Sequence, residues 1–176
     1  DFGQRAHSFE LKSTDNKIIS LNDIKGENGT LIMFICNHCP YVKAVTNDIV
    51  EDCNELKKIG INSVAICAND AQNYPEDSFD NMSKFAKKNQ FSFPYLLDET
   101  QEIAKTYNAV CTPDFFGYNK DLQLQYRGRL RELKNLVPVR DGESDLRKAM
   151  KQIAQTNKGP EKQVPSAGCS IKWINN

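Results

Sequence analysis

The order of apolar patterns along the chain predicts an α/β or α+β fold with a central mixed sheet. Two apolar strands, at 30–35 and 61–67, flank an amphipathic helix, an arrangement typical of parallel neighbouring strands. A hairpin at 114–126 and a final helix at 143–155 follow, and the hairpin adds antiparallel pairing. With 176 residues, the chain is expected to form one domain that buries roughly 70% of its unfolded surface.

Local signals predict the first elements. Short strands at 8–11 and 17–21 enclose the polar turn 13–16. The continuous apolar run at 30–35 is typical of a strand covered on both faces. In the helix 40–58, apolar residues recur at steps of three and four, and Gly60 ends it.

The remaining elements are predicted in the same way. A helix at 77–89 has Phe79, Met82 and Phe85 on its inner face, and a short helix at 99–107 follows. The hairpin strands at 114–118 and 122–126 enclose the turn 119–121. Residues 157–176 are expected to form an extended C-terminal arm, because prolines and glycines interrupt them.

The motif Cys36-Asn37-His38-Cys39 follows the apolar strand directly. Two cysteines three apart at a strand-to-helix turn can close a small disulfide and reopen it. We expect Cys36 to lie at the helix start, to be the more exposed of the two, and to be the attacking thiolate, because unpaired backbone N–H groups and the helix dipole favour the anion. His38, when protonated, favours the thiolate further, and Asn37 is the second residue expected to tune the couple.

A metal site is the main alternative for this motif. Structural zinc sites usually need a second C-x-x-C or an H-x₃₋₅-H pair, and the sequence has neither. The sequence also lacks G-x-G-x-x-G and G-K-[ST], so we expect no metal and no organic cofactor. A metal-binding or metal-delivery module using Cys36, His38 and Cys39, with Cys111, stays open as a second class of function.

The amino-acid composition of the chain argues against two classes of binding partner. Lys and Arg together number 23, as do Asp and Glu, so the net charge is zero and neither nucleic acid nor an anionic membrane is expected as a partner. No apolar stretch approaches the ~20 residues of a transmembrane helix. We expect a cytoplasmic monomer or weak dimer, with the periplasm as the alternative if a leader was removed before Asp1.

Five segments of the sequence carry a family resemblance: CNHCPYVKA (36–44), NDAQNYPEDS (69–78), CTPDFFGY (111–118), YRGRL (126–130) and GCSIKW (168–173). The chain resembles thioredoxin-like proteins, and within them the bacterial redoxin-domain proteins related to alkyl hydroperoxide reductase and thiol-specific antioxidant. The resemblance implies a three-layer α/β/α fold with a central mixed sheet, an N-terminal strand pair, an inserted helix and a C-terminal arm.

The resemblance also implies roles for individual residues. Pro113 matches the cis-proline that faces the disulfide, and its cis bond would aim the backbone of Thr112 at Cys36, ready to pair with an extended substrate segment. Thr30 stands where thioredoxins have a buried aspartate, so proton transfer needs another group or water. Met33 stands where peroxiredoxins have a threonine, which counts against strong peroxidase activity.

The function implied is thiol–disulfide oxidoreductase, through a mixed disulfide, with thiol peroxidase as the alternative. Its partners would be protein or small-molecule disulfides and dithiols, together with a thiol electron donor. Cys111, two residues before Pro113, and Cys169, near the end of the arm, are candidate accessory thiols. The alternative is that both are ordinary small apolar residues.

Overall fold

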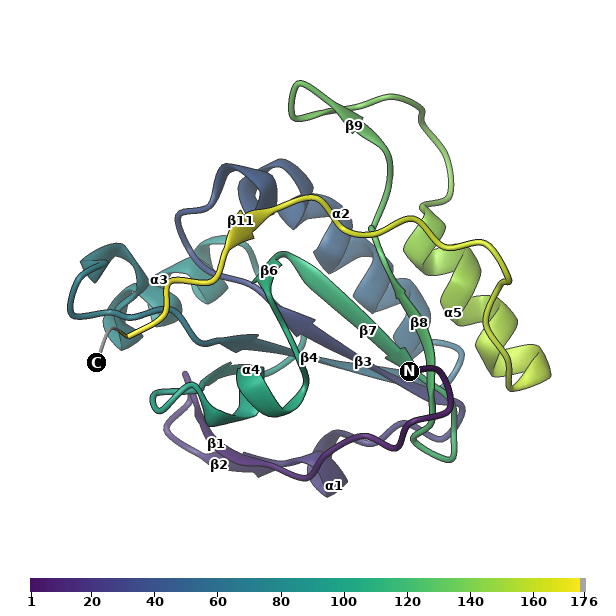
Figure 1. Ribbon diagram of the computed structural model, residues 1–176, viewed down its shortest axis with the longest axis horizontal. Helices are drawn as coiled ribbons and strands as arrows, with labels where there is room; N and C mark the ends of the chain where they lie inside the picture. Colours follow the sequence, from purple (N-terminus) through teal and green to yellow (C-terminus); the bar gives the residue numbers. More distant parts are fainter. Residues whose placement is uncertain (175–176) are drawn as a thin grey trace.

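Seven strands of the computed structural model, which describes residues 1–174, form one mixed sheet in the order β2-β1-β5-β4-β3-β7-β8 (Figure 1). The parallel strands are β3 (Gly29–Phe34), β4 (Ile61–Cys67) and β5 (Tyr95–Leu97). The antiparallel strands are β1 (Glu10–Ser13), β2 (Ile18–Ser20), β7 (Asp114–Tyr118) and β8 (Leu124–Gly128). The central strand β3 therefore has β4 on one side and β7 on the other.

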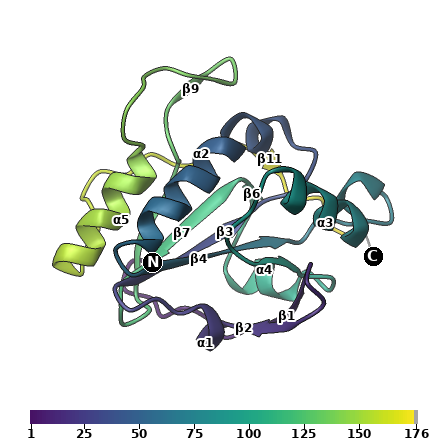
Figure 2. The ribbon, with the colours of Figure 1, turned by 180° about the vertical axis from the view of Figure 1, so that it is seen from behind.

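Helices cover both faces of the sheet, which confirms the predicted three layers (Figures 1 and 2). Along β3, Leu31 and Met33 pack into one core, and Ile32 and Phe34 pack into the other, because successive strand side chains point to opposite faces. The first core is closed by α2 (Pro40–Lys57), α3 (Phe79–Lys88) and α5 (Asp145–Thr156). The second is closed by α1 (Leu21–Ile24) and α4 (Glu102–Thr106).

Polar capping groups account for two differences from the sequence prediction. The turn of helix α1 was not predicted; it forms because Ser20 and Asp23 cap it reciprocally while its apolar residues are buried. The helix predicted at 77–89 begins later, at Phe79, because the Ser78 side chain accepts a hydrogen bond from the Asn81 N–H. Before it lies the short 3₁₀ turn η1 (Pro75–Asp77), which places Asp77 in the interior.

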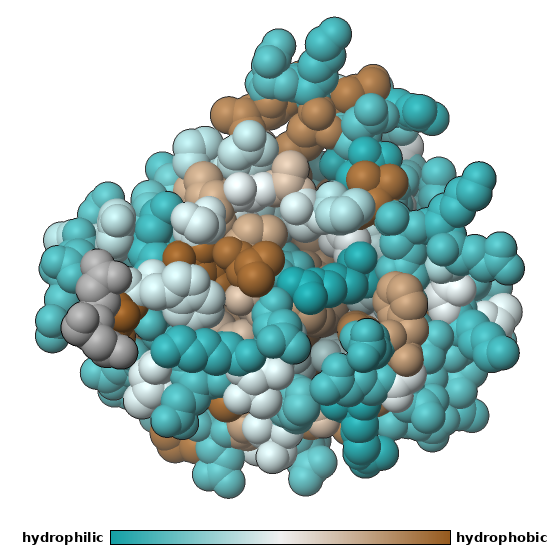
Figure 3. All heavy atoms as spheres, in the orientation of Figure 1, coloured by the Kyte–Doolittle hydropathy of each residue, from teal (hydrophilic) through white to brown (hydrophobic). Residues whose placement is uncertain are grey.

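A short hairpin of β9 (Leu133–Lys134) and β10 (Val137–Pro138) projects from the body beyond β8 (Figure 1). It was not predicted, because its strands have only two residues each. Leu136, Val137 and Val139 leave apolar surface exposed around it, visible as brown spheres at the top of Figure 3.

The C-terminal arm leaves α5 at Asn157, whose φ of 67° ends the helix, and crosses the molecule to the opposite end (Figure 1). Near its end, β11 (Cys169–Ser170) pairs antiparallel with β6 (Cys111–Thr112). The predicted arm therefore contains a strand; its residues 175–176 lie outside the described part. Within residues 1–174, no helix combines the length and the apolar character needed to cross a membrane.

Candidate active site

The two cysteines of the C-x-x-C motif lie in the loop between β3 and α2, at the carboxyl end of the central strand. The expectation that Cys36 starts the helix is wrong: α2 begins at Pro40, and Cys39 is its N-cap. Proline suits the first helical position because it has no N–H to leave unpaired there. Cys36 is not the more exposed residue either, since each cysteine is 1% exposed.

The two thiols share one proton unequally. The pKa of Cys39 is lowered to about 4, chiefly by hydrogen bonding with Cys36 and also by Cys169 and the N–H of Val42, while burial opposes them. The same bond to Cys39 is the largest cause that raises the pKa of Cys36, followed by burial. The two cysteines therefore compete for one proton, and these directions favour ionisation of Cys39 over that of Cys36.

Thr112 and Pro113 face both sulfurs from the opposite side, and the Thr112–Pro113 bond is cis, as predicted. The Thr112 hydroxyl lies 3.4 Å from Cys36 Sγ. The Thr112 carbonyl oxygen lies 3.4 Å from Cys39 Sγ, where it accepts from Cys39 in its thiol form. This carbonyl therefore favours the thiol form of Cys39.

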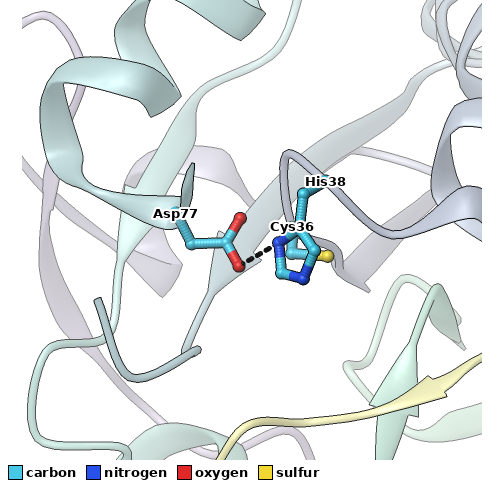
Figure 4. A group of neighbouring side chains, drawn as sticks. All are labelled: Cys36, His38 and Asp77. Atoms are coloured by element: carbon cyan, nitrogen blue, oxygen red, sulfur yellow. Dashed lines mark ion pairs between the residues drawn. The ribbon is translucent and has the colours of Figure 1, made fainter. Parts of the chain in front are cut away.

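A buried carboxylate that the sequence analysis missed lies beside the dithiol. Nδ1 of His38 is 2.6 Å from Oδ2 of Asp77, and Figure 4 shows this contact with Cys36 next to the imidazole. The contact is an ion pair when His38 is protonated, without the alignment of an N–H···O hydrogen bond. Because Asp77 is 0% exposed and comes from η1, the negative charge is held at a fixed point.

Asp77 is held by two further donors. Its Oδ1 accepts the backbone N–H of Asn37 at 2.7 Å, and its Oδ2 accepts the side-chain amide of Asn69 at 2.9 Å. The sequence offered a weak signal for this role, because Asp77 reads equally well as an acidic residue in a first helical turn. The carboxylate thus fixes the loop that carries the dithiol.

Asn37 also holds this loop in place, through hydrogen bonds of its side chain. Its side-chain oxygen accepts from the Tyr95 hydroxyl at 2.7 Å, and its amide donates to the Glu76 carbonyl at 3.1 Å. Burial raises the pKa of Tyr95 well above its usual range, so the phenol stays a donor. Redox tuning by Asn37, if it occurs, acts through the position of the loop.

Thr30 supplies no acid or base to the site. It is fully buried, and its hydroxyl accepts the backbone N–H of Gly26 at 3.0 Å, at the far end of β3 from the dithiol. Asp77 provides instead a buried carboxylate beside Cys36, from a different part of the chain.

The residues that could hold a metal in the structure differ from the set predicted for the metal-binding alternative. In residues 1–174, one cluster of three or more ligand-type side chains occurs: a sulfur of Cys36, a ring nitrogen of His38 and an oxygen of Asp77, within 4.8 Å of one another. Cys39 and Cys111 are not part of this cluster, which corrects the predicted set. Both oxygens of Asp77 already accept hydrogen bonds from protein donors, so a metal would have to displace or share them.

The two accessory thiols lie differently. Cys169 pairs across the strands with Thr112, whose carbonyl oxygen lies 3.4 Å from the Cys39 sulfur, whereas the Cys111 thiol donates to the carbonyls of Pro113 and Ser166, at 3.5 and 3.9 Å. Burial raises the pKa of Cys111 to about 12. The structure therefore brings Cys169, and not Cys111, to the dithiol.

Comparison with known proteins shows the family. The family model described as AhpC/TSA family matches residues 2–132. The chain belongs to the AhpC/TSA family. Its structure is similar to that of an uncharacterized conserved protein from Geobacillus kaustophilus, with 44% identity and a TM-score of 0.95 over 100% of this chain and 94% of that one.

Two more distant similarities bear on fold and activity. The thioredoxin domain of a thiol-disulfide oxidoreductase from Bacteroides vulgatus aligns with a TM-score of 0.61 at 17% identity, over 77% of this chain and 90% of that one, which shows the thioredoxin-like fold of this AhpC/TSA member. The thiol-disulfide oxidoreductase ResA of Bacillus thuringiensis is 26% identical over 124 residues, which are 69% of this chain. The aligned region spans 65% of that relative's length.

Proposed function

We propose that this AhpC/TSA protein is a thiol–disulfide oxidoreductase with Cys36 and Cys39 as its redox dithiol. The observation that carries the proposal is that both cysteine sulfurs lie 3.4 Å from atoms of Thr112, next to its cis bond to Pro113. A stabilised thiolate supplies the nucleophile, and a second thiol in contact with it supplies the resolving group. The similarity to ResA supports this class of reaction.

The reaction begins at Cys39 in this proposal, which exchanges the roles expected from the sequence. The Cys39 thiolate attacks a substrate disulfide, forms a mixed disulfide and releases one substrate thiolate, which takes up a proton. Cys36 then loses its proton, attacks the Cys39 sulfur and releases the second substrate thiol. The chain is left with a Cys36–Cys39 disulfide, which a thiol electron donor reduces; the reverse sequence oxidises a dithiol.

His38 and Asp77 act on the second step. Cys36 must ionise before it attacks, and the negative charge of Asp77 raises its pKa. The imidazole of His38, which belongs to the same 4.8 Å cluster, forms an ion pair with Asp77 when it is protonated and offsets this charge, and the proton of Cys36 passes to water. We assign His38 as the cation that favours ionisation of Cys36 and Asp77 as its positioning residue.

A cavity of about 630 Å³ beside Pro113 offers a path for substrates. It lies between the start of α2, the projecting hairpin and the arm, and its lining includes Tyr41, Arg131, Leu136 and Pro165. An apolar wall with arginine groups suits a polypeptide segment that bears a disulfide. We propose protein disulfides as the substrate class.

Peroxide reduction is a second candidate, since a thiolate at a helix N-terminus is also the species that reduces peroxides. Two features of the site disfavour it. Cys36 occupies the position three residues before Cys39 where peroxiredoxins have threonine, and the Cys39 side chain is 1% exposed.

One set of assays separates these functions. Wild type should reduce insulin with dithiothreitol as donor and should equilibrate a Cys36–Cys39 disulfide with glutathione, while hydrogen peroxide consumption stays near background. Cys36→Ser should still attack substrate disulfides but form no Cys36–Cys39 disulfide, and Cys39→Ser should abolish exchange. Cys53→Ala, on the buried face of α2, is the control that keeps activity. Absence of disulfide exchange in the wild type would refute the proposal, and chelator-sensitive thiol titration would favour the metal alternative.

A further inference from the structure

The C-terminal strand β11 lies where a thioredoxin-like protein would pair with an extended substrate segment. Cys169 stands opposite Thr112, and Ser170 opposite Cys111, in an antiparallel ladder on the edge of β6. Figure 1 shows β11 next to β6, with which it pairs. The backbone beside the cis-proline is thus already paired with the chain's own arm.

The arm is fitted closely to this edge. The Ser166 hydroxyl donates to the Pro113 carbonyl at 2.6 Å, and the Ile171 N–H donates to the Val110 carbonyl at 3.1 Å. Gly168 approaches so closely that a Cβ there would lie 2.2 Å from the Thr112 carbonyl oxygen. Ile171 is 2% exposed, so the strand is anchored in the core on the far side of Cys169.

This seating puts Cys39 between two thiols. Its sulfur lies 3.4 Å from the carbonyl oxygen of Thr112, the residue that pairs with Cys169 of the arm, and both Cys36 and Cys169 lower the pKa of Cys39. Cys169 packs against the same core cluster as the dithiol while remaining partly exposed. Strand β11, with Cys169 near the attacking sulfur of Cys39, therefore resembles a bound substrate segment.

We propose that Cys169 is a third redox cysteine, which takes the disulfide from the Cys36–Cys39 pair by forming a Cys39–Cys169 bond. The inference deepens the proposed function and rests on it, because a substrate disulfide provides the oxidising equivalents. The bond joins the arm covalently to the site, and reduction releases it.

The exchange balances without another reactant. The Cys169 thiolate attacks Sγ of Cys39 in the Cys36–Cys39 disulfide; the Cys39–Cys169 bond forms, the Cys36–Cys39 bond breaks, and Cys36 leaves as a thiolate that takes up the proton lost by Cys169. One disulfide and one thiol are present before and after.

The charges around Cys169 favour this order of events. Burial raises the pKa of Cys169, to about 11, and its interaction with the Cys39 thiolate contributes to the rise, while Lys172 opposes it. Oxidation of Cys39 removes its negative charge, so the pKa of Cys169 falls when a disulfide becomes available to attack.

The test uses the full chain and peptide mapping without reduction. Trypsin places the two motif cysteines in peptide 26–43, Cys169 in peptide 163–172 and Cys111 in peptide 106–120, so each linkage has its own mass. Cys36→Ser is equilibrated with millimolar oxidised and reduced glutathione. We expect most chains to carry the 26–43 to 163–172 linkage, because a thiol held in contact outcompetes dissolved glutathione.

Controls separate the inference from the proposed function. Cys36→Ser/Cys169→Ser should carry glutathione on Cys39 instead, and Cys36→Ser/Cys111→Ser should keep the linkage. Wild type in the same buffers should show both the Cys36–Cys39 and the Cys39–Cys169 disulfides. Glutathione on Cys39 with a free Cys169 in Cys36→Ser overturns the third redox cysteine while leaving the oxidoreductase intact. A wild type that reduces no insulin and forms no Cys36–Cys39 disulfide overturns the proposed function itself.

Discussion

Asp77 and His38, from two segments nearly forty residues apart, meet 2.6 Å apart beside a cysteine pair that is itself closed to solvent. The same carboxylate accepts hydrogen bonds from two other parts of the site. The Asp77 side chain therefore both holds the loop by hydrogen bonds and supplies a negative charge beside the cysteines, and these two roles can be tested separately.

The structural role of Asp77 predicts a loss of stability on truncation. Asp77→Ala leaves the Asn37 N–H and the Asn69 amide without their acceptor in the interior, and each unpaired buried donor costs about 1–3 kcal/mol. We expect the free energy of unfolding to fall by about 2–4 kcal/mol, measured by urea denaturation. Asp80→Ala, an exposed acidic residue on α3, is the control and should change stability by less than about 0.5 kcal/mol. Equal effects of the two variants would contradict the role.

The shared proton predicts which cysteine reacts at mildly acidic pH. Because the pKa of Cys39 is lowered to about 4, it remains a thiolate at pH 6, whereas Cys36, with a raised pKa, remains a thiol. Iodoacetamide should modify Cys39 at least about tenfold faster, at a rate that changes little from pH 6 to 8, whereas an ordinary thiol gains about tenfold per pH unit. Peptide mapping after brief labelling gives the answer. Faster modification of Cys36 would restore the assignment made from the sequence.

The ion pair predicts the effect of His38 on the reduction potential. Without the imidazole, the charge of Asp77 acts on the sulfurs uncompensated and disfavours the thiolate of the reduced form, whereas the disulfide carries no charge to destabilise. His38→Ala should therefore lower the potential, by about 30 mV for each ~1.4 kcal/mol lost, measured by glutathione equilibration. In the Asp77→Asn background the same replacement should shift the potential less. A higher potential in His38→Ala would contradict this account.

Close approach at Gly168 predicts that a single methyl group releases the arm. In Gly168→Ala the new Cβ would lie 2.2 Å from the Thr112 carbonyl oxygen, a backbone atom that cannot move aside easily. We expect Cys39 to be alkylated about tenfold faster at pH 7, since each 1.4 kcal/mol of lost docking energy raises the open population tenfold. Ser170→Ala, at an exposed position of β11, is the matched control. Unchanged alkylation would mean that the arm does not cover the dithiol.

The sequence predicted the fold through signals that act locally. The run at 30–35 is apolar because β3 is covered on both faces, and the cysteine pair follows it at the sheet edge. The start of α2 at Pro40 was predicted correctly, because proline favours the first helical position, whereas the expectation that Cys36 lies at the helix start was wrong for the same reason. Asp77 and the partner of Cys169 escaped prediction for another reason: their roles arise from contacts between distant segments, about which spacing in the sequence carries no information.

Both polar atoms of the Asn69 side-chain amide make hydrogen bonds. Its nitrogen donates to Asp77, and its oxygen accepts the backbone N–H of Lys172, three residues beyond Cys169 in the arm. Turning the amide over would place a donor against Lys172 and an acceptor against Asp77, so both bonds must be kept or both lost. When the arm leaves, the amide loses the partner that fixes its orientation, and the carboxylate beside Cys36 loses a fixed donor. The Asn69 side-chain amide therefore couples the position of the C-terminal arm to the environment of the cysteine sulfurs.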